Sequence, residues 1–532
     1  MIFNILNDRP KLYLWAIILI LSGLTYFQIP VIKELGDLLW AEDANVFIND
    51  VYSQGLSSII KPYAGYLHLY PRFWSMLLPY IGIHNAPIWL FAGWFAAVIV
   101  MGFLLVKALN SVGIKSNEAL LLLALIYLQP SNGEIYFTIT NAQWFLGFAL
   151  GAWYLIKLNV GNTVADLVIL SILILTGPFG VLLLPVLSIK YFVFKNSKPD
   201  KIVIFLYMLC VGVQILSMLT SVRVSSPVDL NLTHWLKAAG VFITMGLPGL
   251  FKLLALGLWL FVANGIFQVF RDKNCTPRQQ GAVLIIIYGL VIYAASLYAS
   301  RNAPHILSPF GGGSRYFWIP YASLFAAAIL FASKQWTKYG IYALIFVICC
   351  VGLSEPKIQR NPTDFRARLK FSEIEKRNIK INPFWEVWPD VWRINYAQPK
   401  LISTPHVFHE LTIDDVLGVR GDINKKSEIL SIQNQDSDPY LIFKIPAECE
   451  KYKYIALIAD TARESPSYAQ FFWGNSQNHK FLEKYSRSSF VGKGRNELVY
   501  AIEKNFNVDM IRFDPSGDKE LQNIYKLKMY CY

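Results

Sequence analysis

The sequence predicts a polytopic α-helical membrane protein that ends in a β-sandwich domain. Of its 532 residues, 54% are hydrophobic and 16% are charged, whereas charged residues make up about a quarter of an ordinary soluble protein. Apolar runs of membrane-spanning length recur up to Glu355, and strand-length runs between polar turns follow. The net charge of +13 fits Lys and Arg on the cytoplasmic loops of a membrane protein, so no nucleic-acid partner is expected.

About eleven apolar runs are expected to span the lipid bilayer, since roughly 20 apolar residues in a helix bridge about 30 Å of hydrocarbon. The expected spans are residues 11–30, 86–107, 118–130, 140–158, 165–177, 180–194, 201–221, 250–270, 281–299, 316–333 and 339–353. No small-residue cleavage site follows the first run, so it is expected to be a retained helix. Gly177 and Pro178 interrupt one stretch, which is either one broken helix or two spans that meet at a tight turn.

Basic residues fall in alternate loops, which the positive-inside rule assigns to the cytoplasm. These residues are Lys107, Lys115, Lys190, Lys195, Lys198, Lys201, Arg271, Lys273, Arg278, Lys334 and Lys338. The N-terminus is then cytoplasmic, and with an odd number of spans the chain after Glu355 is extracytoplasmic.

The composition changes after residue 355, and three parts are expected. Residues 1–355 form the membrane domain, residues 356–395 a helical and Trp-rich connector, and residues 396–532 a jelly-roll-like sandwich. A charged amphipathic helix is expected over 363–380. The connector's tryptophans either pack at the membrane interface or stack on sugars; they are Trp385, Trp388 and Trp392.

Six segments of the last part have the apolar pattern of strands: residues 440–444, 454–458, 469–473, 497–502, 510–513 and 524–529. Cys449 and Cys531 are the two cysteines of this part. An oxidising compartment would let them pair, but the sequence leaves the pairing open.

The acid pair Glu42-Asp43 follows the first apolar run. Ionisable groups near a membrane are costly and therefore candidates for function. Alternatively, Asp43 caps a helix over residues 46–60 whose apolar side chains recur at helical spacing and lie flat on the membrane. A polar aromatic loop over residues 61–72 comes next, with Tyr63, Tyr66, His68 and Arg72.

The order of these features resembles the membrane-embedded glycosyltransferases of the GT-C class, including a bacterial subgroup. The phrases that carry the resemblance are Glu42-Asp43-Ala44-Asn45-Val46-Phe47, Pro62 to Arg72, Asn141-Ala142-Gln143-Trp144, Thr176-Gly177-Pro178-Phe179 and Ser314-Arg315-Tyr316-Phe317. For the last domain the resemblance is to carbohydrate-binding-like sandwiches and rests on Asn496-Glu497-Leu498 and on residues 511–515. It implies a sugar donor carried on polyprenyl phosphate, a glycan acceptor such as lipopolysaccharide O-antigen, and the bacterial inner membrane.

The resemblance also implies roles for residues. Asp43 is expected to be the catalytic base with Glu42 assisting, although the reverse assignment stays open. The second acid either orients the sugar or holds a divalent cation such as Mg or Mn. Arginines at outward loop edges would bind the donor phosphate or, alternatively, lipid headgroups: Arg72, Arg301 and Arg315. Expected substrate-binding residues, with packing roles as the alternative, are Tyr63, Tyr66, His68, Asn141, Gln143, Trp144, His305 and Tyr316.

Residues 311–313, three consecutive glycines, lack the strand and helix context of a phosphate-binding loop. They are expected to be flexible chain, and no nucleotide cofactor is expected. Two other functions would also require many spans and phosphate-binding arginines: a transporter or flippase for a lipid-linked glycan, and an O-antigen polymerase. The spans show no internal repeat, which disfavours the transporter.

Overall fold

The chain forms two compact units, the first made of residues 1–31 and 54–359 and the second of residues 32–53 and 360–532. A computed structural model describes residues 10–28, 35–131, 133–157, 161–194, 200–221, 227–272, 275–355, 364–375, 378–380, 393–394, 406–412, 415–420, 422–426, 429–433, 439–463, 467–475, 481–482, 485–491, 493–504, 507–515 and 522–532. The division after residue 359 lies where the composition changes. The sequence did not indicate that residues 32–53, with the acid pair, group with the second unit and not with the membrane domain.

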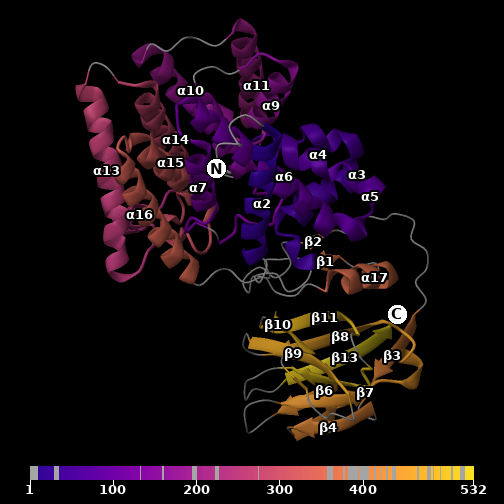
Figure 1. Cartoon of the computed structure of the whole chain (residues 1–532). Coiled ribbons are helices and arrows are strands. Elements are labelled where there is room, and N and C mark those ends of the chain that lie inside the picture. The colour runs from indigo at the N-terminus through magenta and orange to yellow at the C-terminus, as the bar shows by residue number, and fades with distance from the viewer. Residues whose placement is uncertain are drawn as a thin grey trace. The chain divides into compact units, whose positions relative to one another are not determined.

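The described part of the first unit is helical (Figure 1). Its helices are α2 (Pro10–Gln28), α4 (Leu69–Ser75), α5 (Leu78–Ile81), α6 (Ala86–Ser111), α7 (Ser116–Tyr127), α8 (Ala142–Gly151), α9 (Val164–Ile174), α10 (Phe179–Ser188), α11 (Lys201–Thr220), α12 (Leu232–Thr244), α13 (Lys252–Arg271), α14 (Pro277–Ala299), α15 (Arg315–Phe331) and α16 (Gln335–Ser354). Two π-helical segments, η6 (Ala152–Ile156) and η7 (Ile189–Val193), continue α8 and α10.

Among the described residues, five helices are long and apolar enough to cross a membrane: α6, α11, α13, α14 and α16. Apolar helices of 10–17 residues occupy the other expected spans. Several helices can therefore span a membrane, as the composition predicts, but length and composition support five of the expected eleven. The alternatives at Gly177 are resolved, because α9 and α10 are separate helices joined by a turn in which Gly177 has φ +90°.

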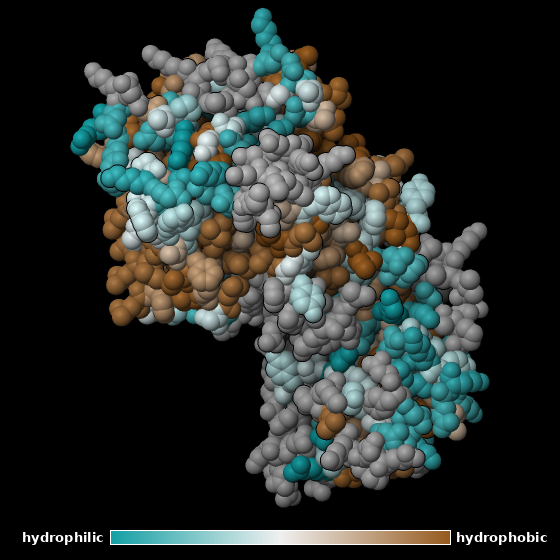
Figure 2. All heavy atoms as spheres, in the orientation of Figure 1, coloured by the Kyte–Doolittle hydropathy of each residue, from teal (hydrophilic) through white to brown (hydrophobic). Residues whose placement is uncertain are grey.

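The helical unit carries apolar side chains on its outer surface, which Figure 2 shows in brown. On α11, Phe205 is 69% exposed and Leu216 is 62% exposed; on α13, Leu260 and Phe267 are similarly exposed. Water would disfavour helix faces of this kind, whereas lipid chains would solvate them. This surface supports membrane association.

Two of the lysines that indicate the orientation, Lys190 and Lys338, are buried. The Lys338 Nζ atom of α16 lies 2.8 Å from Glu118 Oε2 of α7, and Lys190 Nζ donates to the carbonyls of Tyr154 and Lys157. Because buried ammonium groups need such partners, these two lysines have structural roles beside any effect on orientation.

The second unit begins with short helical segments and ends in two antiparallel sheets. The segments are η2 (Leu35–Leu38), η3 (Asp43–Ile48), α3 (Asn49–Gln54) and α17 (Phe365–Glu375). The strands are β1 (Ile379–Lys380), β2 (Arg393–Ile394), β3 (Val407–Leu411), β4 (Val416–Arg420), β5 (Asp422–Lys426), β6 (Ile429–Gln433), β7 (Tyr440–Lys444), β8 (Tyr454–Arg463), β9 (Ser467–Gly474), β10 (Ser486–Val491), β11 (Gly494–Glu503), β12 (Met510–Asp514) and β13 (Gln522–Cys531). Trp385, Trp388 and Trp392 lie outside the described residues.

In the described part of this unit, strands β3 to β13 form a sandwich (Figure 1), whereas β1 and β2 pair with each other in a separate two-stranded sheet. One sheet has the order β10-β9-β12-β7-β4 and the other β11-β8-β13-β6-β5, with β3 also pairing with β13. From β6 to β13 the chain changes sheet at every step except between β9 and β10, which pair within one sheet. This is the strand order of a jelly roll. Buried side chains from both sheets, including Phe443, Leu457, Phe471 and Phe513, make one core.

The six predicted strand segments are confirmed as β7, β8, β9, β11, β12 and β13. Cys449 and Cys531 form a disulfide, with 5.3 Å between their Cα atoms. The predicted charged helix is α17, which packs on the outer face of β8, β11 and β13 through Ala367 and Phe371.

Candidate functional site

The acid pair lies at the start of η3 in the second unit. Asp43 has no exposed surface and Glu42 is 9% exposed. The Asp43 carboxylate accepts a hydrogen bond from the Trp40 N–H at 3.1 Å, and the Asp43 N–H donates to the Trp40 carbonyl at 2.8 Å. Asp43 therefore closes the turn before the helix.

The capping alternative needs correction. Glu42, not Asp43, occupies the N-cap position of η3, and its side chain makes no capping hydrogen bond. The expected single helix over residues 46–60 is divided into η3, α3 and a 3-10 helix, η4 (Gly55–Ile60). Its apolar residues also differ in exposure, because Val46, Phe47 and Val51 are buried whereas Leu56 and Ile60 are exposed.

Two further acids of the same unit, Asp37 and Asp50, are also buried. Asn49, which precedes Asp50, donates from Nδ2 to the Arg393 carbonyl of β2 at 3.0 Å. This hydrogen bond fixes the segment within its unit. Asp37 and Asp50 were not predicted as site residues. The signal that could have found them is four acids within fourteen positions of an otherwise apolar region.

In the first unit, the aromatic loop encloses His68. The main chains of Tyr63 and Tyr66 exchange two hydrogen bonds, so that their rings lie 5.6 and 4.7 Å from the His68 ring. His68 is 1% exposed. Burial, together with the positive charge of Arg72, lowers the pKa of His68 to about 3, so this imidazole is neutral at physiological pH. Arg72 lies one helical turn further on and is also 1% exposed.

Gln214 of α11 holds this loop against the α9–α10 turn. Its Oε1 accepts from the Leu67 N–H at 2.9 Å, and its Nε2 donates to the carbonyl of Gly177 at 3.0 Å. The Gly177 N–H in turn donates to the Leu67 carbonyl. Gln214 was not predicted, although a lone amide in an apolar run is a detectable signal.

The predicted residues on α8 and α15 continue this network. Gln143 Oε1 lies so close to Gly177 that a Cβ atom added to this glycine would be only 2.8 Å from it. The Trp144 ring lies 5.6 Å from the Tyr316 ring, and the Arg315 guanidinium lies 5.1 Å from the centre of that same ring.

Arg315 is paired with Glu134, an acid that no pattern in the sequence singles out. Its Nη1 lies 3.2 Å from Glu134 Oε2, which also accepts from the Gly313 N–H. Asn141 Nδ2 donates to the Glu134 carbonyl at 2.7 Å. Within residues 311–313, expected to be flexible chain, Gly313 thus donates to Glu134, and the Ser314 N–H donates to the Gly311 carbonyl in a turn.

Nine predicted residues thus belong to one network in the first unit: Tyr63, Tyr66, His68, Arg72, Asn141, Gln143, Trp144, Arg315 and Tyr316. Arg301 and His305 belong to another group. The Asp229 N–H donates to the Arg301 carbonyl at 2.8 Å, and the Arg301 guanidinium lies 4.6 Å from the centre of the Tyr298 ring. His305 faces Asp229 and His234. The Asp229 pKa is lowered, mainly by the hydrogen bond from His234.

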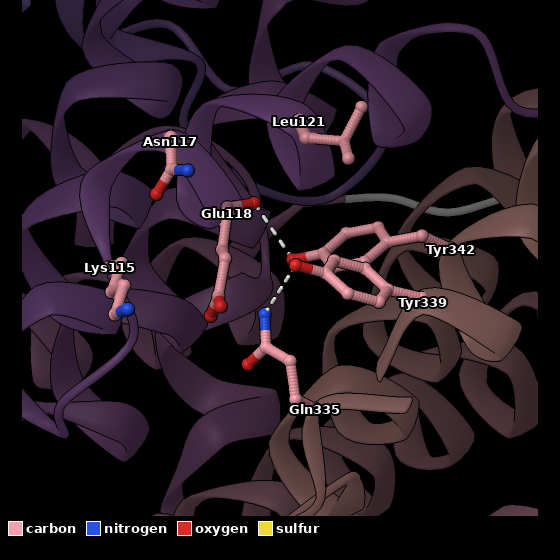
Figure 3. Close-up of a pocket in the computed structure, with 7 residues that line it drawn as sticks. All are labelled: Lys115, Asn117, Glu118, Leu121, Gln335, Tyr339 and Tyr342. Carbon is pink, nitrogen blue, oxygen red and sulfur yellow. Dashed lines mark hydrogen bonds between the residues drawn. The ribbon is translucent and has the colours of Figure 1, made fainter. Parts of the chain in front are cut away.

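A cavity of about 210 Å³ lies between α7 and α16 (Figure 3). Its lining includes Glu118, whose carbonyl accepts from the Tyr342 hydroxyl at 2.8 Å, and Gln335, which donates to the Tyr339 hydroxyl. None of the predicted site residues lines this cavity.

No protein-family model and no curated protein matches this chain. Solved carbohydrate-binding modules are similar to about a quarter of it, in the C-terminal region. A low-affinity xylan binding module from Roseburia intestinalis is 10% identical, with a TM-score of 0.18 over 23% of this chain and 94% of the module. A family 29 carbohydrate binding module from Piromyces equi is 9% identical, with a TM-score of 0.19 over 24% of this chain and 93% of the module. TM-scores this low carry no conclusion about function.

Proposed function

We propose that this protein is a membrane glycosyltransferase that transfers a sugar from a polyprenyl-phosphate donor to a surface glycan such as lipopolysaccharide O-antigen. The observation that carries the proposal is the complete burial of Asp43 beside Glu42, in a chain with several helices able to span a membrane. Burial of a carboxylate costs free energy, so a fold retains buried acids where they have a role. The closing of one turn does not require two adjacent acids.

In the proposed reaction, Asp43 accepts the proton of an acceptor hydroxyl while that oxygen attacks the anomeric carbon of the donor. The bond between this carbon and the phosphate oxygen breaks, and the lipid phosphate leaves with the bonding electrons. Attack on the face opposite the phosphate inverts the configuration. Glu42 assists by orienting the sugar.

The leaving phosphate needs compensation of its negative charge, which guanidinium groups provide through paired N–H donors. Arg72 is our first candidate, because its guanidinium is buried in the first unit next to His68, whose imidazole is neutral and adds no charge. Arg315 is the second candidate, although Glu134 already offsets part of its charge. Tyr63, Tyr66 and Trp144 offer ring faces on which a sugar can stack.

The proposal includes eleven spans, a cytoplasmic N-terminus and an extracytoplasmic C-terminal unit in the bacterial inner membrane. The disulfide between Cys449 and Cys531 supports the placement of that unit, because disulfides persist in oxidising compartments.

The decisive test is Asp43→Asn. An asparagine side chain has the same shape, and its oxygen can still accept the Trp40 N–H, but it cannot serve as a base. We expect the transfer of sugar to the surface glycan to fall by about 10²–10⁴-fold in cells that produce normal amounts of folded variant, as measured by mass spectrometry of the glycan. Asp50→Asn is the matched control, since it also removes a buried carboxylate of this unit and should keep the product.

If the Asp43→Asn variant formed as much modified glycan as the wild type, Asp43 would not be the catalytic base. The transporter alternative predicts a different result for the same variant. Its lipid-linked donor would accumulate on the cytoplasmic leaflet, and purified protein mixed with donor and acceptor in detergent would form no product even as wild type.

A further inference from the structure

Asp229, His234 and His305 bring three metal-ligating atoms together within 4.8 Å of one another. Asp229 precedes α12, His234 lies in its first turn, and His305 lies in a 3-10 helix, η9 (Pro304–Ile306), between α14 and α15. All three residues belong to the first unit. The two chain segments are joined by the hydrogen bond from the Asp229 N–H to the Arg301 carbonyl.

The two imidazoles converge on one carboxylate oxygen. His234 Nδ1 lies 2.6 Å and His305 Nδ1 lies 3.7 Å from Asp229 Oδ2, and the two ring centres are 4.0 Å apart. The first distance is a hydrogen bond and the second is too long for one. The buried His305 Nδ1 makes no hydrogen bond with any described residue. One hydrogen bond therefore joins His234 to Asp229, while His305 Nδ1 faces the same carboxylate oxygen without forming one.

We propose that these three side chains bind one divalent transition-metal ion, with zinc as the representative metal. Two imidazole nitrogens and one carboxylate oxygen are a ligand set that proteins use for zinc, with bonds of roughly 2.0–2.2 Å. Ligands around a tetrahedral ion of this size lie roughly 3.4 Å apart. The 2.6 Å distance must lengthen and the 3.7 Å distance must shorten, which rotation of the partly exposed imidazoles allows.

Three protein ligands leave a fourth coordination position for water or for an oxygen atom of a bound molecule. The ion would cross-link the segment before α12 to the segment before α15. None of its three residues has a role in the proposed glycosyl transfer, so the two proposals can be tested independently.

The test is metal binding by the full chain in detergent, purified with a tag that contains no histidine. After treatment with a chelator and dialysis against zinc chloride, elemental analysis should find one equivalent of zinc more in the wild type than in His234→Ala or His305→Ala. His84→Ala is the matched control, since His84 is an exposed histidine in another 3-10 helix, η5 (Ile83–Asn85). It should bind as much zinc as the wild type.

A cobalt-substituted sample gives a second readout. We expect the visible absorption of nitrogen- and oxygen-bound cobalt, which is lost in His305→Gln, a variant that keeps most of the side-chain volume. Thermal unfolding and gel filtration show whether each variant is folded. Equal zinc in wild type, His234→Ala and His305→Gln would overturn the proposal, as would a cobalt spectrum dominated by thiolate charge transfer. Loss of glycosyl transfer alone would not bear on it.

Discussion

At the scale of single residues, the environment of His68 makes a prediction about pH. Its pKa in the folded protein is about 3, below the value of about 6.5 for an unfolded chain. As pH falls from 6.5 towards 3, the unfolded state binds a proton that the folded state does not bind. The contribution of neutral His68 to the free energy of unfolding is therefore fully present above pH 6.5. Below pH 6.5 the free energy of unfolding decreases by about 1.4 kcal/mol for each pH unit.

Thermal unfolding of the full chain at pH 7 and pH 5 measures this effect. In His68→Asn the decrease between these two pH values should be smaller than in the wild type. His84→Asn should keep the wild-type decrease, because His84 is exposed. An unchanged slope in His68→Asn would show that other groups cause the acid sensitivity.

At the scale of secondary-structure elements, the ion pair between α7 and α16 makes the second prediction. Glu118→Gln leaves the Lys338 ammonium group largely buried, with 10% side-chain exposure. Breaking a buried pair costs about 3–5 kcal/mol, and the adjacent cavity of 210 Å³ places the expected loss near the lower end. The midpoint of thermal unfolding in detergent should fall by several degrees, and adding Lys338→Met should restore part of it. Lys115→Gln is the control, since Lys115 lines the same cavity and has no ion pair with a described residue.

The elements also show what the sequence could and could not predict. Helix positions and six strands follow from local apolar patterns, and β8, β11 and β13 are long enough to be evident. Strand β5, Asp422 to Lys426, has no alternating pattern and was missed. The pairing of Arg315 with Glu134 joins residues 181 positions apart, and the Asp229 cluster joins segments about 70 apart. No local pattern encodes such contacts, because the fold creates them.

At the scale of the whole molecule, the disulfide relates the sandwich to its compartment. Cys449 and Cys531 are 82 positions apart, so their bond closes a long loop that begins before β8 and ends at the end of β13. Removing such a bond typically costs about 2–4 kcal/mol. Cys449→Ser combined with Cys531→Ser should therefore lower the unfolding midpoint of the sandwich. Cys275→Ser combined with Cys350→Ser should not, because both of those cysteines are free.

The same pair tests the proposed orientation in intact cells. If the sandwich faces an oxidising compartment, Cys449 and Cys531 resist alkylation until a reductant is added, and a polymer-linked maleimide then adds two labels. The measurement is made on a variant in which the other four cysteines are serine, so that each gel shift reports on this pair. Two labels without reductant would mean that the cell keeps these thiols reduced. That result would place the sandwich in the cytosol, where it could not reach the acceptor glycan. It would overturn the proposal of extracytoplasmic transfer even if the Asp43→Asn variant were inactive.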